Sequence, residues 1–460
     1  MRTAIFKMIT HSCKKNHMNK DISAILPSIK TSIPGPYSRQ YMAELAGYES
    51  PAITARYLAR AESGGVDCPI VFAKTEDVFI YDVDGNRFID LTAGFGVAIT
   101  GHANADIVIA AQDQLAEMPH AMGDAFPAKN KVVLAKKLAD ISPGDLKRSL
   151  FANAGFEAVE AALKTALLKT GKPGIIAFEN AYHGLGYGAL AVTSYRDSFR
   201  QPFLSQLNPH VSHLPYPVQS DGFAALLEKT IQQSSIPIGA VIIEPILGRG
   251  GIIEASLKSL QIIRDITSRY NIVMIVDEIY TGFGRTGQWF AIEAAGVVPD
   301  LLCIGKGLSG GFPISAAIGT DDVMSGWADT PGEAIHTSTF LGNPVGCAMA
   351  LKSIDILESG LMSQVNSIGS YFKDMLYRLQ KIFPVISEVR GRGLMLGIEF
   401  KHGDPHFTLK ISKKLLQRGV ICLPCGIAGN VLSFTPPYTL KIPHIDFISH
   451  QLQQLLEETI

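Results

Sequence analysis

The sequence predicts an α/β fold built on an open, mostly parallel sheet, and three apolar runs lead to this expectation. Residues 239–243 (GAVII), 272–276 (IVMIV) and 301–304 (LLCI) are almost continuously apolar. Such runs are typical of strands that are buried on both faces, as the strands of parallel sheets are. In an open sheet of this kind, ligands bind beyond the carboxyl ends of the strands. We therefore expect one ligand crevice at that edge.

Two charged side chains of opposite sign are expected in this crevice. Asp277 and Glu278 stand where the run 272–276 ends, and the run 301–304 leads to Lys306 within the glycine-rich residues 305–311. A lone lysine among glycines is usually a solvated loop residue, but a buried-strand carboxylate in the same crevice changes that interpretation. Pyridoxal phosphate requires both groups, an amine that reacts with its aldehyde and an acid at its pyridinium nitrogen.

Length and composition exclude several classes of protein. The 460 residues allow two or three domains, and 47% hydrophobic with 18% charged residues suits a globular enzyme with a large core. A formal charge of -1 argues against nucleic-acid binding. We find no run of about eighteen apolar residues, so no membrane span is expected. The six scattered cysteines do not resemble a disulfide framework, and we infer a reducing, cytoplasmic setting.

Two short motifs have the spacing of metal ligands, but we expect no metal at either. Cys422 and Cys425 lie within an apolar run and have no second pair nearby, which indicates a structural strand. His402 and His406 are separated by Pro405, which argues against the helix that would align them.

Residues 277–287 (DEIYTGFGRTG), followed by Gly305-Lys306-Gly307, resemble the signature of class III, or omega, aminotransferases. The similarity extends from about Pro51 to about Leu455, with the motifs in the family's order. It implies a fold type I transferase dependent on pyridoxal phosphate, with a large domain around a mixed, mostly parallel seven-stranded sheet and a smaller α+β domain. The expected boundaries are a poorly ordered extension (1–40), a segment shared with the small domain and active site (41–100), the large domain (101–345) and the C-terminal small domain (346–460).

The resemblance assigns the groups around the cofactor ring. Lys306 would bond the aldehyde and then act as the base, and Asp277 would pair with the pyridine nitrogen. Glu244 matches a position near the phenolic oxygen. Ile279 would pack behind the ring, and Tyr280 stands where a glutamine is common and would reach the same oxygen as Glu244.

The resemblance also assigns the phosphate and stacking groups. Backbone amides at Gly155 and Phe156, where a helix is expected to begin, would hold the phosphate without the usual neighbouring hydroxyls. Tyr182 would stack on the ring with His183 beside it, and Thr339 would reach the phosphate of the other subunit of a homodimer. From the residues alone, an ordinary loop-to-helix turn and a surface tyrosine remain open.

Residues 282–287 also fit the dinucleotide pattern G-x-G-x-x-G, so a dehydrogenase is a rival interpretation. Five residues, 277–281, separate the first glycine, Gly282, from the expected strand, and no helix is expected to begin there. No acid near position 307 completes a ribose-binding unit. We interpret this match as accidental.

The implied reaction is a ping-pong exchange between an amine donor and an oxo-acid acceptor. Phe95 would contact substrate, although a core aromatic fits equally well. Leu185, Arg249 and Ser433 replace the arginine, glutamate and second arginine with which 4-aminobutyrate aminotransferases handle carboxylates. A carboxylate would lose roughly 1.5–3 kcal/mol for each charge-assisted bond.

We therefore hypothesise a donor without a carboxylate near those sites: a diamine, an amino sugar or another bulky omega-amine. Arg249 complicates this hypothesis, because it would also suit a relocated anchor for the acceptor's carboxylate. Alternatives are a conventional 4-aminobutyrate aminotransferase and a class III aminomutase or racemase.

Overall fold

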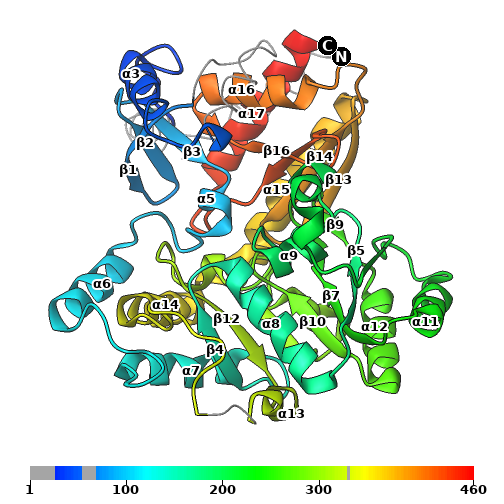
Figure 1. Ribbon diagram of the computed structural model, residues 1–460. Helices are drawn as coiled ribbons and strands as arrows, with labels where there is room; N and C mark the ends of the chain where they lie inside the picture. The colour runs from blue at the N-terminus through cyan, green and yellow to red at the C-terminus, as the bar shows by residue number, and fades with distance from the viewer. Residues whose placement is uncertain (1–25, 54–68, 329–331) are drawn as a thin grey trace.

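The computed structural model describes residues 26–53, 69–328 and 332–460. A seven-stranded sheet forms the centre of the larger part (Figure 1), in the order β4-β12-β11-β10-β7-β5-β6. The strands are β4 (Arg148–Ala152), β5 (Gly174–Phe178), β6 (Val211–Leu214), β7 (Ile238–Ile243), β10 (Val273–Asp277), β11 (Leu301–Ile304) and β12 (Ser315–Gly319). Only β12 runs antiparallel to its neighbours β4 and β11. The predicted mixed, mostly parallel sheet is confirmed.

Both faces of the sheet are buried, as the apolar runs predicted. Along β10, Val273 and Ile275 belong to the core on the side of α8, while Met274 and Val276 belong to the core on the opposite side. This alternation is the period-two pattern of a strand between two layers. The helices of this part are α6 (Ala105–Glu117), α7 (Lys129–Ile141), α8 (Gly155–Thr170), α9 (Tyr187–Val192), α10 (Asp197–Arg200), α11 (Phe223–Gln233), α12 (Leu257–Tyr270), α13 (Asp321–Met324) and α14 (Pro344–Ile356).

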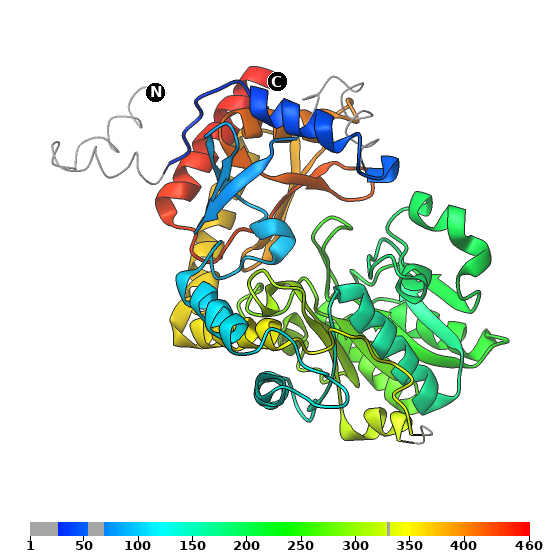
Figure 2. The same cartoon turned by 60° about the vertical axis from the view of Figure 1, so that its left-hand side comes forward.

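A smaller unit is assembled from both ends of the described chain (Figure 2). One of its sheets, β1-β2-β3-β15, pairs β1 (Phe72–Glu76), β2 (Phe79–Asp82) and β3 (Arg87–Asp90) with β15 (Val420–Ile421). The other, β13-β14-β17-β16, contains β13 (Ile386–Arg392), β14 (Met395–Phe400), β16 (Leu423–Cys425) and β17 (Val431–Phe434). The helices α15 (Gln364–Ile382), α16 (Phe407–Gln417) and α17 (Ile442–Thr459) complete it. One core joins Val78 and Ile89 to Phe372 and Phe434.

The division between the two units lies later in the chain than the expected boundary at 346. Cys347, Ala350 and Ile354 of α14 are buried in the core of the large sheet. A π-helical turn, Leu357–Leu361, then separates α14 from α15, with Gly360 at a φ of 125°. We place the start of the C-terminal unit at α15, because that helix contributes Phe372, Leu376 and Leu379 to the small core.

The expected poorly ordered extension falls partly on residues 1–25, which lie outside the described residues. The rest of it packs on the small unit. Ser28 forms a β-bridge with Arg87, and the helix α3 (Pro36–Leu45) begins where Tyr37 and Ser38 donate their N–H groups to the carboxylate of Asp84. None of the described helices is long and apolar enough to cross a membrane.

Asn86 ties this N-terminal segment to the β2–β3 hairpin. Its buried Oδ1 accepts the N–H groups of Lys30 and Thr31 at 2.6 and 3.0 Å, and its Nδ2 donates to Asp82 at 2.7 Å. Asn86→Ala would leave two backbone donors without their acceptor, at a cost of about 2 kcal/mol or more. We expect limited proteolysis to release the segment before residue 45 at least about 10-fold faster than in the wild type. Thr31→Val removes the hydroxyl that accepts from Asn86 Nδ2 at 2.9 Å and donates to the carbonyl of Ser32, but keeps both backbone donors paired, and should have a smaller effect. Equal rates for all three proteins would contradict this anchoring.

Candidate active site

The side chains predicted to form the crevice follow neighbouring strands at the same edge of the large sheet. Asp277 ends β10, Glu244 follows β7 and Lys306 follows β11. Tyr182 and His183 follow β5, and Gly155 begins the helix that follows β4. Because the carboxyl ends of parallel strands share one edge, these residues are brought together from positions up to about 150 apart.

Asp277 is held in place by two donors. Its Oδ2 lies 2.7 Å from His183 Nδ1, and its Oδ1 accepts the N–H of Ile279 at 3.1 Å. His183 is itself fixed by its backbone N–H, which donates to Thr193 Oγ1 at 2.9 Å. The buried Nε2 of His183 has no hydrogen-bond partner among the described residues. The pair therefore presents an oriented carboxylate backed by a histidine.

Glu244 is the second carboxylate of the crevice. It accepts the N–H groups of Tyr182 at 2.8 Å and Gly248 at 3.1 Å. Burial raises its pKa to about 7, with the charge of Asp277 adding to the rise and His183 and the two N–H groups opposing it. A carboxyl group with such a pKa exchanges a proton near neutral pH.

Lys306 is half-buried, and its amine is easier to deprotonate than an ordinary lysine amine. Burial lowers its pKa to about 8, against the opposing effects of Asp277 and Glu244 and with a smaller contribution from the charge of Arg249. Its backbone has a φ of 37°, a strained region that non-glycine residues adopt mostly where the surrounding structure holds them. The site thus contains a nucleophilic amine at a fixed position.

The aromatic ring of Tyr280 contacts this amine, with Lys306 Nζ 3.7 Å from the ring centroid. The hydroxyl of Tyr280, which we predict to reach the cofactor's oxygen, lies 3.1 Å from Thr435 Oγ1. The ring fits between two glycines, because a Cβ on Gly96 or on Gly248 would lie 2.4 Å from it. The ring of Tyr280 is therefore fixed in its contact with the amine of Lys306.

The start of α8 leaves backbone N–H groups free at the position where we predict the phosphate to bind. Glu157 accepts the N–H groups of Asn153 and Ala154, at 2.8 and 3.2 Å. The next N–H groups, of Gly155 and Phe156, belong to the first turn and have no intrahelical acceptor. A Cβ on Gly155 would lie 3.0 Å from the side chain of Ile279, two residues beyond β10, so a larger residue here would displace that side chain.

Of the four residues predicted to contact substrate, Phe95, Leu185 and Arg249 are exposed, and we call these three the rim of the crevice. Phe95 is exposed in the short helix α5 (Ala93–Gly96), beside the glycine that contacts Tyr280. Leu185 is 46% exposed in the turn after His183. Ser433 lies within β17, where its hydroxyl donates to the carbonyl of Leu423 at 2.9 Å. Thr339, which is predicted instead to reach the cofactor of a second subunit, is exposed in the segment before α14.

Arg249 lies over an aromatic cluster at the same rim. Its guanidinium carbon is 4.4 Å from the ring centroid of Tyr182, 5.1 Å from that of Tyr195 and 5.7 Å from that of Phe199. Tyr182 meets the other two rings edge to face. This contact brings a cation directly to the ring that we predicted to stack on the cofactor.

The rival dinucleotide motif has a structural role. Residues 282–287 form turns after β10, and no helix begins there. Arg285 is 1% exposed and donates to the carbonyl groups of Leu394 and Pro436, at 3.0 and 2.6 Å. The loop therefore joins the two units of the fold.

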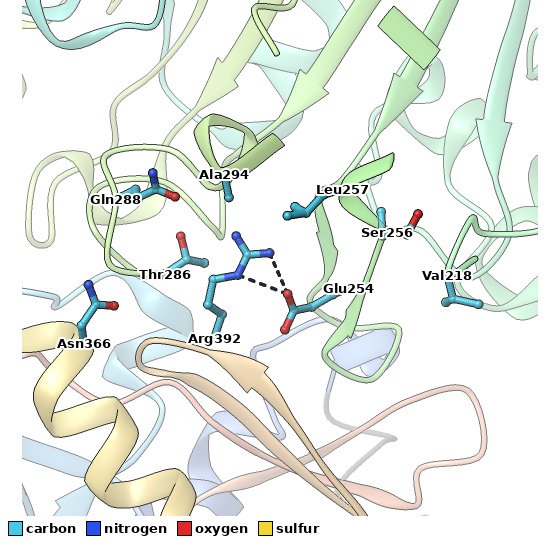
Figure 3. A pocket seen from close by; sticks show the side chains of 10 residues that line it. Val218, Glu254, Ser256, Leu257, Thr286, Gln288, Ala294, Asn366 and Arg392 are labelled. Carbon is cyan, nitrogen blue, oxygen red and sulfur yellow. Dashed lines mark hydrogen bonds and ion pairs between the residues drawn. The ribbon is translucent and has the colours of Figure 1, made fainter. Parts of the chain in front are cut away.

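A separate cavity of about 660 Å³ lies between the same two units (Figure 3). Arg392 and Glu254, the latter in β9 (Ile253–Glu254), form an ion pair of 2.7 Å in its wall. None of the predicted site residues lines it, and we do not assign the chemistry to it. The described residues contain no cluster of possible metal ligands, and burial raises the pKa of Cys422 and of Cys425 to about 12.

The family model for class III aminotransferases matches residues 61–456. The chain belongs to the class III aminotransferases. Enzymes of this class depend on pyridoxal phosphate and move an amino group from an amine to an oxo acid. The amine of Lys306, the oriented Asp277 carboxylate and the free N–H groups at the start of α8 fit that cofactor.

The sequence and the fold of this aminotransferase are similar to those of several transaminases. It is 36% identical over 429 residues to the 4-aminobutyrate aminotransferase of Mycobacterium leprae, with 88% of this chain and 95% of the relative covered. Among solved structures, an (S)-enantioselective omega-transaminase from Thermomicrobium roseum superposes with a TM-score of 0.83 at 28% identity, covering 92% and 98% of the two chains. A PLP-bound amine transaminase from an uncultivated Pseudomonas species gives 0.79 at 27% identity, covering 85% and 95%.

Several contacts of the aminotransferase site were not predicted from its sequence. Thr435 Oγ1 lies 3.1 Å from the hydroxyl of Tyr280, Thr193 orients His183, and Ser315 Oγ donates to the carbonyl of Ala154 at 2.7 Å. No local pattern in the sequence distinguishes these hydroxyl residues from others. Tyr195 also has no motif of its own.

The contact between Tyr280 and Lys306 predicts a measurable change in the lysine. The face of an aromatic ring favours the ammonium over the neutral amine by about 0.5–2 kcal/mol. Tyr280→Leu should therefore lower the pKa of Lys306 from about 8 by roughly half to one unit. The pH dependence of acylation of Lys306 in the cofactor-free protein, followed by mass spectrometry, measures it.

Tyr280→Phe is the matched control, because it keeps the ring and removes only the bond to Thr435. Its lysine should titrate within a few tenths of a unit of the wild type. A Lys306 pKa that falls equally in both variants, or that rises in Tyr280→Leu, would show that the ring does not stabilise the ammonium.

Proposed function

We propose that this aminotransferase uses Lys306 as the amine that bonds the cofactor and as the base that moves the proton of the donor carbon. The bound cofactor supplies an aldehyde and an electron-withdrawing ring. Asp277, oriented by His183, would face the pyridine nitrogen, and Glu244 the phenolic oxygen. The N–H groups of Gly155 and Phe156 would hold the phosphate, with Tyr182 and Ile279 on the two sides of the ring.

We further propose that the amine donor carries no carboxylate at its far end. One observation carries this proposal: the two positions that supply arginines in 4-aminobutyrate aminotransferases hold Leu185 and Ser433. Leu185 offers no charge, and the hydroxyl of Ser433 is bonded within its own sheet. A diamine, an amino sugar or another omega-amine has no carboxylate at its far end, so its binding needs no arginine at these two positions.

The 36% identity to the Mycobacterium leprae 4-aminobutyrate aminotransferase supports the second candidate, a conventional enzyme for that omega-amino acid. A class III aminomutase or racemase is a third candidate, which would need no separate acceptor. The two substitutions by uncharged side chains favour the carboxylate-free donor over both.

The active enzyme is proposed to be a homodimer in which Thr339 reaches the phosphate of the other subunit's cofactor. Thr339 is exposed, and large apolar side chains nearby are exposed with it, namely Met122, Phe126 and Phe340. Exposed apolar patches of this kind are typical of interfaces. The four described cysteines are buried and free, which supports a reducing, cytoplasmic location.

Visible absorbance of the purified enzyme tests the choice of donor. With no acceptor present, putrescine should remove the yellow band of the bound cofactor, whereas 4-aminobutyrate should leave it, because its carboxylate finds no partner at Leu185 or Ser433. Equal loss of the band with both amines would overturn the carboxylate-free donor. No yellow band after addition of the cofactor would overturn the role of Lys306.

Restoring a charge at the turn should reverse part of this preference. In Leu185→Arg, a guanidinium on the exposed turn would bind the carboxylate of 4-aminobutyrate, worth roughly 1.5–3 kcal/mol. We expect kcat/KM for 4-aminobutyrate relative to putrescine to rise about 10- to 100-fold, measured from the rate of band loss. Leu185→Gln adds a polar group of similar length without charge and should change the ratio by less than about threefold.

A further inference from the structure

Arg249 is a cation at the mouth of the active site without an acidic partner. It lies in the turn between β8 (Ile246–Leu247) and β9, and its side chain is exposed. Within the described part of the chain, no carboxylate oxygen lies within ion-pair distance of its guanidinium. By contrast, Arg390 and Arg392 of the small unit pair with Glu399 and Glu254.

The turn that carries Arg249 is fixed on both sides. Its carbonyl accepts the N–H of Gly426 at 2.9 Å, and the N–H of Gly248 donates to Glu244. A Cβ on Gly250 would lie 2.7 Å from the carbonyl of Asn180, so the turn packs closely against the segment that carries Tyr182. Its position relative to Glu244 and Tyr182 is therefore set by the backbone.

The aromatic rings contact the guanidinium of Arg249 through their π-systems. This contact leaves the N–H donors of the guanidinium available for a ligand. Tyr182, at 4.4 Å from the guanidinium carbon, is the nearest of three rings around it. A guanidinium has five N–H donors in a planar fork, which matches the two oxygens of a carboxylate. Its charge also reaches the reactive amine, because it contributes to the lowered pKa of Lys306.

We propose that Arg249 binds the carboxylate of the oxo-acid acceptor. This inference rests on the proposed function, in which the donor has no carboxylate and the acceptor brings the one anionic group that must be recognised. A single cation at the rim then separates the two half-reactions: the acceptor is attracted to Arg249, and the donor reacts without it. Arg249 is a specificity-determining residue for the second half-reaction.

Arg196 provides a matched control beside the same cluster. Its guanidinium carbon lies 5.0 Å from the ring of Tyr195, and it is exposed like that of Arg249. Its Nη2, however, donates at 3.4 Å to the carbonyl groups of Gly426 and Ile427. The two arginines share an environment but differ in how many donors are free.

The experiment isolates the acceptor half-reaction of the holoenzyme. The enzyme is loaded directly with pyridoxamine phosphate, and return of the yellow band is followed against the concentration of pyruvate, with propanal as an acceptor that lacks a carboxylate. In Arg249→Gln, the pyruvate concentration for half-saturation should rise about 10- to 100-fold, while the response to propanal changes by less than about threefold. In Arg249→Lys, which keeps a charge, the pyruvate concentration for half-saturation should lie between those of the wild type and of Arg249→Gln.

Binding without turnover gives a second readout. Propionate, an unreactive carboxylate, should competitively inhibit the reaction of the wild-type enzyme with pyruvate. Its inhibition constant should rise about 10-fold or more in Arg249→Gln. Arg196→Gln should behave as the wild type in both assays. Unchanged pyruvate saturation in Arg249→Gln, as would follow if a carboxylate of a second subunit neutralised Arg249, overturns the inference, and so does an equal loss with propanal.

These outcomes are separable from those that test the donor. Loading with pyridoxamine phosphate bypasses the amine donor, so the acceptor assay runs even if putrescine fails to remove the yellow band. Putrescine could fail to remove the yellow band while Arg249→Gln still requires more pyruvate for half-saturation. That result would overturn the carboxylate-free donor and leave the role of Arg249 standing.

Discussion

Burial of three ionisable groups at one edge of the large sheet is the constraint on which the site depends. Asp277 and Glu244 are buried and Lys306 is half-buried, and removing a charge from water is costly unless partners compensate for it. For Asp277 the compensation comes from His183 and a backbone N–H. Lys306 and Glu244 are compensated less, so their pKa values move toward neutrality. The same burial that costs stability makes an amine and a carboxyl group that exchange protons near neutral pH.

Much of the fold could be predicted because the sheet is specified locally. Each run of apolar residues must be a strand with two buried faces, and parallel strands bring Asp277 and Lys306 to one edge wherever the rest of the chain lies. The contact between Tyr280 and Thr435 spans 155 positions and involves an ordinary threonine, so no local pattern indicates it. The packing of Gly96 and Gly248 against the ring of Tyr280 is likewise a tertiary contact that no local pattern indicates.

The small unit was harder to predict because its two sheets depend on pairing between distant segments. β15 pairs with β3, so residues near 420 complete a sheet that begins near 72. Asn86 lies in the turn between β2 and β3, and the segment that this asparagine fixes has no strong pattern of its own. The placement of residues 26–45 therefore follows from tertiary hydrogen bonds. The buried Arg285 likewise looked like part of a nucleotide loop, although it joins the two units.

Charge placement at the rim is best understood as one coupled change. The resemblance to 4-aminobutyrate aminotransferases implies that a glutamate at position 249 would pair with an arginine at position 433. With Ser433 in place of that arginine, a glutamate at 249 would be an unpaired anion near Glu244 and Asp277, and it would oppose their ionisation further. An arginine at 249 instead adds a positive charge near two buried carboxylates, and the rings of Tyr182, Tyr195 and Phe199 hold it. Reversal of this position alone would therefore add repulsion without recreating the original ion pair.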